Sequence, residues 1–328
     1  MHSFKFSTAL VLGAALFACT NAVSAATAQA AYPCKVVKIV SPYPPGCTTD
    51  ILARLLTQGL GQGLGTTVIV ENKGGASSNI GTEFVSGAAP DGCTLLLGNN
   101  TGVVINRNLY KLRLDPVQSL VPVVEVASVP LVLYVNAAES DTTPDALVAA
   151  VKAAPGKYSF ASGGSGSPQH LMGELLKVER GLDMAHIPYR GQGPAMQDVV
   201  AGQVAIAFET TTALVPQLGG GRVRALATTG ETRSKNLPQV PTMKELGYGS
   251  FVVENWYGIF APAKTPAAMV ERLNQELVKV LRSPTVAKSL AEMGSREVAG
   301  TPAAFSSFIA KELPHWESLV KRTGAKVD

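Results

Sequence analysis

The sequence predicts an α/β protein in which mostly parallel sheets are covered by crossover helices. Short β-branched or apolar runs alternate with amphipathic helical patterns, and turns rich in glycine and proline separate them. Such alternation is typical of βαβ units, whose strands lie parallel. The composition agrees, because 46% apolar and 16% charged residues in a chain of 328 residues can fill the core of one large or two ordinary domains.

The overall charge argues against a nucleic-acid partner. Lys and Arg number 28 against 24 Asp and Glu, a formal charge of +4 that is too weak and too scattered for a nucleic-acid-binding surface. Aromatic residues are also sparse, at 6%. The apolar content in turn argues against a disordered chain.

The first 31 residues are expected to be a secretory signal peptide. Lys5 supplies a basic start, residues 6–17 form an apolar run, and small residues of the A-x-A kind follow. Cleavage is expected near residues 25–31, which exports the mature chain to an oxidising compartment. Two alternatives stay open: a membrane anchor, although the run is shorter than the roughly 20 residues a bilayer requires, and a lipoprotein acylated on Cys19.

Strands are expected where β-branched or apolar runs stand between turns. Taken in order, these runs cover residues 36–40, 67–71, 94–98, 121–135, 157–161, 184–189, 204–208 and 223–228.

Helices are expected where apolar residues recur at helical spacing or where a capping hydroxyl precedes a proline. The first pattern covers residues 51–60. The second predicts a helix start because the N–H that proline lacks has no partner in the first turn. It occurs at Thr143-Pro144, Ser167-Pro168, Thr265-Pro266, Ser283-Pro284 and Thr301-Pro302.

Two loops that run from a strand into a helix contain most of the groups that could bind a ligand. They cover residues 42–50 (PYPPGCTTD) and 161–168 (ASGGSGSP). Each places backbone N–H groups and hydroxyls at the positive end of a helix, an arrangement that binds small anions such as carboxylates. Two such loops could hold one dianion from opposite sides. The alternative is that both are tight turns whose hydroxyls only cap helices.

Known catalytic motifs are either absent from the sequence or incomplete. The chain has no GxxxxGK[ST] and no GxGxxG after a strand, and GGSGS around Ser165 lacks the last glycine of a nucleophile elbow. His170 could act as a base for Ser165 or line a cleft, but no orienting acid can be named. With His186 and His315 it forms no metal-ligand pattern. No catalytic residue, cofactor or metal is therefore expected, and a serine hydrolase using Ser165 is kept as the alternative function.

A series of motifs along the chain resembles one known family. They are Tyr32-Pro33-x-Lys35, Pro44-Pro45-Gly46 with Asp50, Val70-Glu71-Asn72-Lys73, 75–81 (GASSNIG), 90–95 (PDGxTL), His170, 188–191 (PYRG), 201–204 (AGQV), 221–227 (GRVRALA) and 260–262 (FAP). Together they look like the Bug family, the extracytoplasmic solute receptors (substrate-binding proteins) of tripartite tricarboxylate transporters. The similarity covers the chain from about residue 32 to its end.

The resemblance implies a two-lobed periplasmic binding protein of type II, in which each lobe is a mostly parallel sheet flanked by helices. Lobe I would hold residues 32–130 and 255–328, lobe II would hold residues 131–254, and the two chain crossings would form the hinge. Such a monomeric receptor captures a small organic acid in the interlobe cleft and delivers it to the membrane subunits of its transporter. A sensor that presents its ligand to a signalling system has the same fold and stays open.

In this family the cleft holds mono- or dicarboxylates through backbone amides, hydroxyls and waters more than through arginines. The resemblance therefore implies that the ligand is contacted from residues 43–50, 77–81 and 162–170, from the segment around Thr101 and from a strand end at 208–210. The expected ligand-binding residues are Tyr43, Gly46, Cys47, Thr48, Thr49, Asp50, Ser78, Asn79, Thr101, Ser162, Ser165, Gly166, Ser167, His170 and Glu209.

This chain departs from the family pattern at some of these positions. Cys47-Thr48-Thr49 stand where a glycine-rich stretch is usual, and Glu209 stands where Asp is more common. A carboxylate at residue 209 would repel a ligand carboxylate but could accept a hydrogen bond from an ammonium or hydroxyl group, so an amino or hydroxy acid stays open. Tyr43, often Phe, could stack on an aromatic acid or only wall the pocket.

The lobe type that the resemblance implies also predicts how the cysteines pair. Cys34 precedes the first expected strand and Cys93 the third, and in such a lobe these strands are parallel neighbours roughly 4.8 Å apart. That separation is within reach of a disulfide. A Cys34–Cys93 disulfide is expected, with Cys47 as a free thiol in the first loop.

Overall fold

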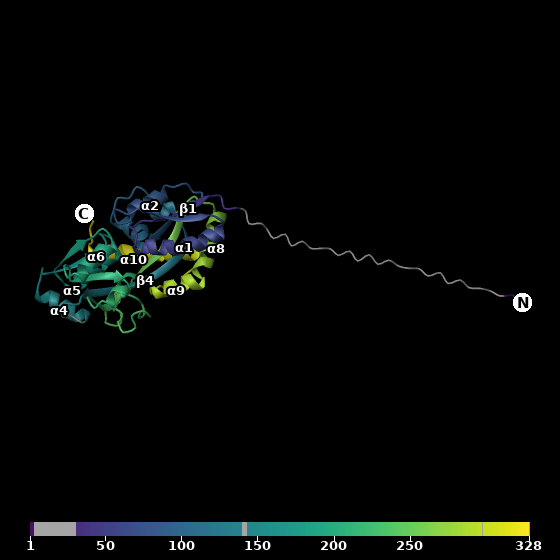
Figure 1. The fold of residues 1–328 in the computed structure, drawn as a ribbon. Helices are drawn as coiled ribbons and strands as arrows, with labels where there is room; N and C mark the ends of the chain where they lie inside the picture. The colour runs from purple at the N-terminus through teal and green to yellow at the C-terminus, as the bar shows by residue number, and fades with distance from the viewer. Residues whose placement is uncertain (3–30, 140–142, 297, 328) are drawn as a thin grey trace. The chain divides into compact units, whose positions relative to one another are not determined.

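The structure is a computed structural model that describes residues 1–2, 31–139, 143–296 and 298–327 (Figure 1). The expected signal peptide, with its cleavage site and Cys19, lies almost wholly outside the described residues. Within the described ranges, no helix has both the length and the hydropathy needed for crossing a bilayer.

The strands occur where the sequence predicts them, with one addition at the C-terminal side. They are β1 (Val36–Ser41), β2 (Thr67–Asn72), β3 (Thr94–Asn99), β4 (Leu120–Asn136), β5 (Tyr158–Ser162), β6 (Met184–Pro188), β7 (Ile206–Thr210), β8 (Val223–Thr228) and β9 (Glu254–Pro262). The sequence analysis did not predict β9 as a strand, although its last three residues were part of a family motif. The strands join in the order β2-β1-β3-β9-β4-β7-β5-β6, and β8 pairs with β4 outside that path.

Strand β4 passes through two groups of strands. Residues 120–130 pair with β9, whereas residues 131–136 pair with β7 and β8. We call β1, β2, β3, β9 and residues 120–130 the first strand group, and β5, β6, β7, β8 and residues 131–136 the second strand group. The change of partner falls close to the expected hinge crossing, while the lobe boundaries themselves stay a prediction.

Parallel pairing is found away from this crossing. β1 pairs in parallel with β2 and β3, and β5 with β6 and β7. Pairs that involve β4 or β9 are antiparallel.

The helices are α1 (Thr48–Leu64), α2 (Asn79–Ser86), α3 (Pro116–Ser119), α4 (Pro144–Ala153), α5 (Pro168–Arg180), α6 (Gln192–Val200), α7 (Thr211–Leu218), α8 (Ala267–Leu281), α9 (Pro284–Glu292) and α10 (Pro302–Thr323). In Figure 1, α1, α2 and α8 accompany the first strand group and α4, α5 and α6 the second, with β4 running between them.

Most of the hydroxyl–proline starts are confirmed. Thr143, Ser167 and Thr301 each accept a hydrogen bond from the N–H three residues on. The start predicted at Pro266 is one residue early, because Pro266 has an extended ψ of 137° and is itself the N-cap.

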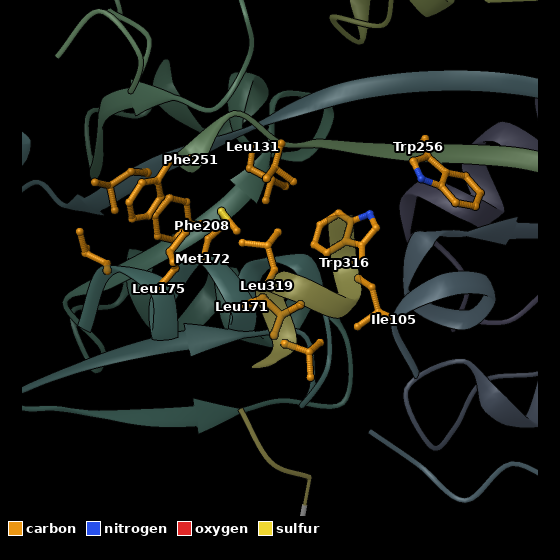
Figure 2. Close-up of a cluster of buried hydrophobic side chains, with 14 of the residues drawn as sticks. Ile105, Leu131, Leu171, Met172, Leu175, Phe208, Phe251, Trp256, Trp316 and Leu319 are labelled. Atoms are coloured by element: carbon orange, nitrogen blue, oxygen red, sulfur yellow. The ribbon is translucent and has the colours of Figure 1, made fainter. Parts of the chain in front are cut away.

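A buried cluster links α10 to both strand groups. Helix α10 packs against β4, α5 and a π-helical turn, Thr101–Ile105. Figure 2 shows Trp316 and Leu319 of this helix among Leu171, Met172 and Ile105. The cluster gives the two groups a common apolar support away from the expected ligand loops.

The cysteines pair as expected. Cys34 and Cys93 form a disulfide with their Cα atoms 5.6 Å apart, and β1 and β3, which they precede, are parallel neighbours. Cys47 forms no disulfide.

Candidate ligand-binding site

Most of the expected ligand-binding residues gather at the carboxyl ends of four strands, whereas Ser78 and Asn79 follow β2. Loop 42–47 follows β1 and leads into α1, and Thr101 lies just beyond β3. The second loop follows β5 and leads into α5, and Glu209 lies near the end of β7. Parallel strands present their carboxyl ends at one edge of a sheet, so each strand group contributes two of these segments.

A small cavity of about 20 Å³ lies where the segments meet. This volume holds about one water molecule. The expected residues that line it are Tyr43, Cys47, Thr48, Thr49, Thr101, Ser167 and Glu209. Larger hollows adjoin it: one of about 760 Å³ shares Cys47, Thr48 and Gln192 with it, and one of about 770 Å³ shares Tyr43 and Gly163.

The other expected residues lie further from this cavity. Gly46 lines the hollow of about 760 Å³, and Ser78 and Ser165 line the hollow of about 770 Å³. The residues that line neither the cavity nor these hollows are Asp50, Asn79, Ser162, Gly166 and His170. Several of these hold the loops in place.

Asp50 holds the first loop from within α1. Its Oδ2 accepts hydrogen bonds from the N–H of Gly46 and from Arg54, both at 3.0 Å, and its Oδ1 accepts one from Asn72 at 2.9 Å. Burial alone would raise the pKa of Asp50, but the hydrogen bonds from Arg54, Gly46 and Asn72 hold that pKa below its usual value. The loop backbone is thus tied to the first turn of the helix that it opens.

Two stacked histidines hold the second loop. The ring of His186 bonds Ser162 Oγ through Nε2 at 2.7 Å, and His170 Nδ1 accepts the N–H of Gly166 at 3.1 Å. The two ring centroids are 4.0 Å apart. Burial, and then the charges of His170 and Lys177, lower the pKa of His186 to about 3, so its ring is neutral at pH 7.

The second loop is also bonded across the cleft through its backbone. The carbonyl oxygen of Ser165 accepts hydrogen bonds from Ser77 Oγ at 2.6 Å and from Tyr110 Oη at 3.2 Å. Ser77 follows β2 and Tyr110 follows β3, so both belong to the part of the chain that carries the first strand group. These bonds join the two groups at the mouth of the cleft.

The sequence analysis did not name seven of the residues that line the cavity. Gly163, Gln169 and Thr210 lie within the expected ligand segments 162–170 and 208–210, whereas Asn99, Gln192, Asn255 and Tyr257 were not expected. The available signal was an amide side chain within a strand, as at Asn99 and Asn255, or in the first turn of a helix, as at Gln169 and Gln192.

The missed amides leave polar atoms without partners. Gln169 is 0% exposed, and neither of its amide atoms makes a hydrogen bond of good geometry with the described residues. The same holds for Gln192 Oε1 and Asn255 Oδ1. An unsatisfied buried polar atom costs about 1–3 kcal/mol, so these atoms favour a ligand or water that pairs with them.

Glu209 sets the charge of the cavity. Burial raises its pKa to about 7, opposed by hydrogen-bond donors on Thr210 and by the nearby Gln169. Burial also raises the pKa of Tyr43, Tyr257 and Cys47, so these groups are uncharged at pH 7. Among the described residues that line the cavity, none is Lys, Arg or His.

The described residues contain one cluster of potential metal ligands, Cys34, Asp91 and Cys93. Two of its members form the disulfide, so this cluster does not indicate a metal centre.

The comparisons with known proteins agree on one family. The sequence model of the tripartite tricarboxylate transporter family receptor, TctC, matches residues 52–325. BugT of Bordetella pertussis (strain Tohama I) is 37% identical to this chain over 322 residues, which are 98% of this chain and 99% of BugT.

Solved structures give the same result. The periplasmic binding protein BugD is similar with a TM-score of 0.84 and 35% identity, over 90% of this chain and 100% of BugD. Rpa4515 of R. palustris, solved with adipate, has a TM-score of 0.86 and 30% identity over 90% of this chain and 100% of its own. MatC of Rhodopseudomonas palustris, solved with bound malate, has a TM-score of 0.83 and 30% identity over 88% and 100%.

Proposed function

Because the chain belongs to the tripartite tricarboxylate transporter receptor family, we propose that it is a periplasmic receptor for a small organic carboxylate. It captures the acid in the cavity between the two strand groups and delivers it to the membrane subunits of a tripartite tricarboxylate-type transporter. The adipate and malate of the two R. palustris proteins support this ligand class.

The observation that carries the proposal is the set of buried, unpartnered amides around the cavity. Gln169 and Gln192 accompany the second strand group and Asn255 belongs to the first. A ligand with several hydrogen-bonding oxygens would satisfy amides from both groups only when the groups are close together. Ligand binding therefore stabilises the closed conformation by contacts that an open one lacks.

The surroundings of Ser165 favour binding over hydrolysis. A serine nucleophile needs a histidine whose ring nitrogen is directed at the hydroxyl. Here His170 Nδ1 accepts the Gly166 N–H, and Nε2 lies 3.9 Å from Glu174. His170 is thus engaged in holding the loop.

Thermal unfolding of the exported protein with a panel of mono-, di- and tricarboxylates, amino acids and aromatic acids tests the proposal. A bound acid should raise Tm in a concentration-dependent way. Gln169→Leu should reduce the rise, whereas Gln275→Leu, on the exposed face of α8, should leave it unchanged. If no carboxylate raises Tm, or if the Gln275 variant loses the response as fully as the Gln169 variant, the proposal is wrong.

Transport is tested in cells. Deletion of the receptor should abolish uptake of the acid that binds, and the Gln275→Leu chain should restore it while the Gln169→Leu chain restores less. Uptake that is unaffected by the deletion would contradict delivery to a transporter.

A further inference from the structure

Glu209 is a buried carboxylate at the centre of the ligand cavity. It lies near the end of β7, opposite Val132 of β4, and is 2% exposed. Its Oε1 accepts hydrogen bonds from the N–H of Thr210 at 2.7 Å and from Thr210 Oγ1 at 3.1 Å. The amide of Gln169 is a further donor beside this carboxyl group. A carboxylate has two oxygens with about four acceptor sites, so Glu209 can still accept a hydrogen bond from a ligand.

The groups that face Glu209 from the neighbouring elements carry no positive charge. The ionisable ones are Cys47 from the first loop, Tyr134 from β4 and Tyr257 from β9. Gln169 of α5 is the nearest amide. Within the described residues, no Lys, Arg or His lines this cavity. An ionised carboxylate in such surroundings is costly unless it gains a cation or further donors.

We propose that Glu209 is a specificity-determining residue that selects organic acids carrying a hydrogen-bond donor, either an ammonium or a hydroxyl group. That donor is directed to the carboxylate of Glu209, while the ligand carboxylate is received by the uncharged donors elsewhere in the cavity. The inference rests on the proposed function and narrows its ligand class from carboxylates in general to amino and hydroxy acids.

The physical reason is the difference between two kinds of contact with one carboxylate. An ammonium or hydroxyl group makes a charge-assisted hydrogen bond with it, and an ammonium group also neutralises it. A ligand carboxylate in the same place is repelled, unless one of the two carboxyl groups takes up a proton. Dicarboxylates without an ammonium or hydroxyl group should therefore bind more weakly, and their complex with the protein should take up a proton from the solvent.

Calorimetric titration with matched ligands tests the inference. At pH 8, malate or aspartate should bind at least about tenfold more tightly than succinate, since a hydrogen bond to a charged group is worth about 1.5–3 kcal/mol. If longer acids fill the site better, 2-aminoadipate against adipate is the equivalent pair.

Glu209→Gln keeps the shape of the side chain and should remove most of the preference for the donor-bearing acid. Glu271→Gln, an exposed change on α8, should leave it intact.

A pH series on the wild-type protein tests the same inference without a variant. Between pH 6 and 8, the affinity for succinate should fall by up to about tenfold per pH unit, because binding then requires a proton. The affinity for the donor-bearing acid should not fall. Equal affinities within each pair, or an equal change of both in the Glu209→Gln protein, would overturn the inference and leave the proposed function standing. Failure of every carboxylate to bind would instead overturn the proposed function.

Discussion

The two loops at the ligand cavity both lead from a strand into a helix but contribute to the site differently. The first loop and the start of α1 turn the side chains of Tyr43, Cys47, Thr48 and Thr49 to the cavity. The second loop itself contributes only Gly163 and Ser167, and its backbone carbonyl at Ser165 is bonded by the opposite strand group. A strand–loop–helix sequence rich in Gly, Pro and hydroxyl residues can therefore either contact a ligand or take part in closure.

The contacts that hold each loop in place explain why the two loops contribute differently to the site. The first is held from its own half of the chain, by Asp50 and by Asn72, which donates hydrogen bonds to Asp50 and to the carbonyl oxygen of Tyr43. The second is held by histidines on two neighbouring elements and by hydroxyls from the other strand group. The first loop should therefore keep its form in an open state, whereas the second loses bonds when the groups separate.

Removing the disulfide should have the largest effect, because the cross-link between the segments before β1 and β3 lowers the conformational entropy of the unfolded chain. Its cysteines are 59 positions apart in the sequence, for which the loop-closure relation predicts a loss of about 4 kcal/mol in the free energy of unfolding. Urea denaturation of a Cys34→Ser/Cys93→Ser protein measures this. Cys47→Ser is the matched control and should cost less than about 1 kcal/mol. Equal losses in both proteins would contradict this role of the cross-link.

Asp50→Asn should have the next largest effect. It removes charge-assisted hydrogen bonds to Arg54, Gly46 and Asn72, so the free energy of unfolding should fall by about 2 kcal/mol at pH 7. Since the pKa of Asp50 is lowered in the folded state, its contribution to stability is present above the usual aspartate pKa of 3.8 and is lost as the pH falls below it. Wild type and variant should thus converge in acid, and a difference that stays constant with pH would contradict this origin. Asp183→Asn, an exposed change, is the control.

His186→Phe should weaken the second loop by about 1 kcal/mol, because it keeps a stacked ring but removes the bond to Ser162. The pKa of His186 is lowered to about 3 from 6.5, so the unfolded chain binds a proton between these values while the folded chain does not. Wild-type stability should therefore fall as the pH drops from about 6.5, and the variant should lack this component. Thermal unfolding at pH 7 and pH 5 measures it, with the exposed His315→Phe as control. An identical pH response in wild type and His186→Phe would contradict the stacked arrangement.

Ser77→Ala should have the smallest effect on stability, within about 0.5 kcal/mol, because Tyr110 still bonds the Ser165 carbonyl. The substitution should instead weaken the contact between the two strand groups. Because it removes one hydrogen bond worth about 1 kcal/mol, the ligand affinity should fall about fivefold. Calorimetric titration of the variant measures this, against Ser307→Ala, which lies on the exposed side of α10. Unchanged affinity would show that the contact does not contribute to closure.

Most of the fold and about half of the site could be predicted because they depend on local patterns or on the family resemblance. Strand positions followed from β-branched runs, and the disulfide followed from the strand order that the lobe type implies. β9 was missed because Asn255 and Gly258 interrupt its apolar pattern, and it is stabilised by pairing with β3 and β4. His170 was expected at the ligand, but its position behind the loop depends on its stacking with His186, which lies on another element.

The sequence by itself determined where α4, α5, α9 and α10 begin, where strands β1 to β8 run and which two loops end in helix N-termini, because these depend on residues within a few positions of one another. Only the tertiary structure decided which side chains share the cavity. Gln169, Gln192, Glu209 and Asn255 come from separate elements, and their approach depends on strand register and on the closure of the two strand groups. Those are non-local contacts, for which no short stretch of sequence carries the information.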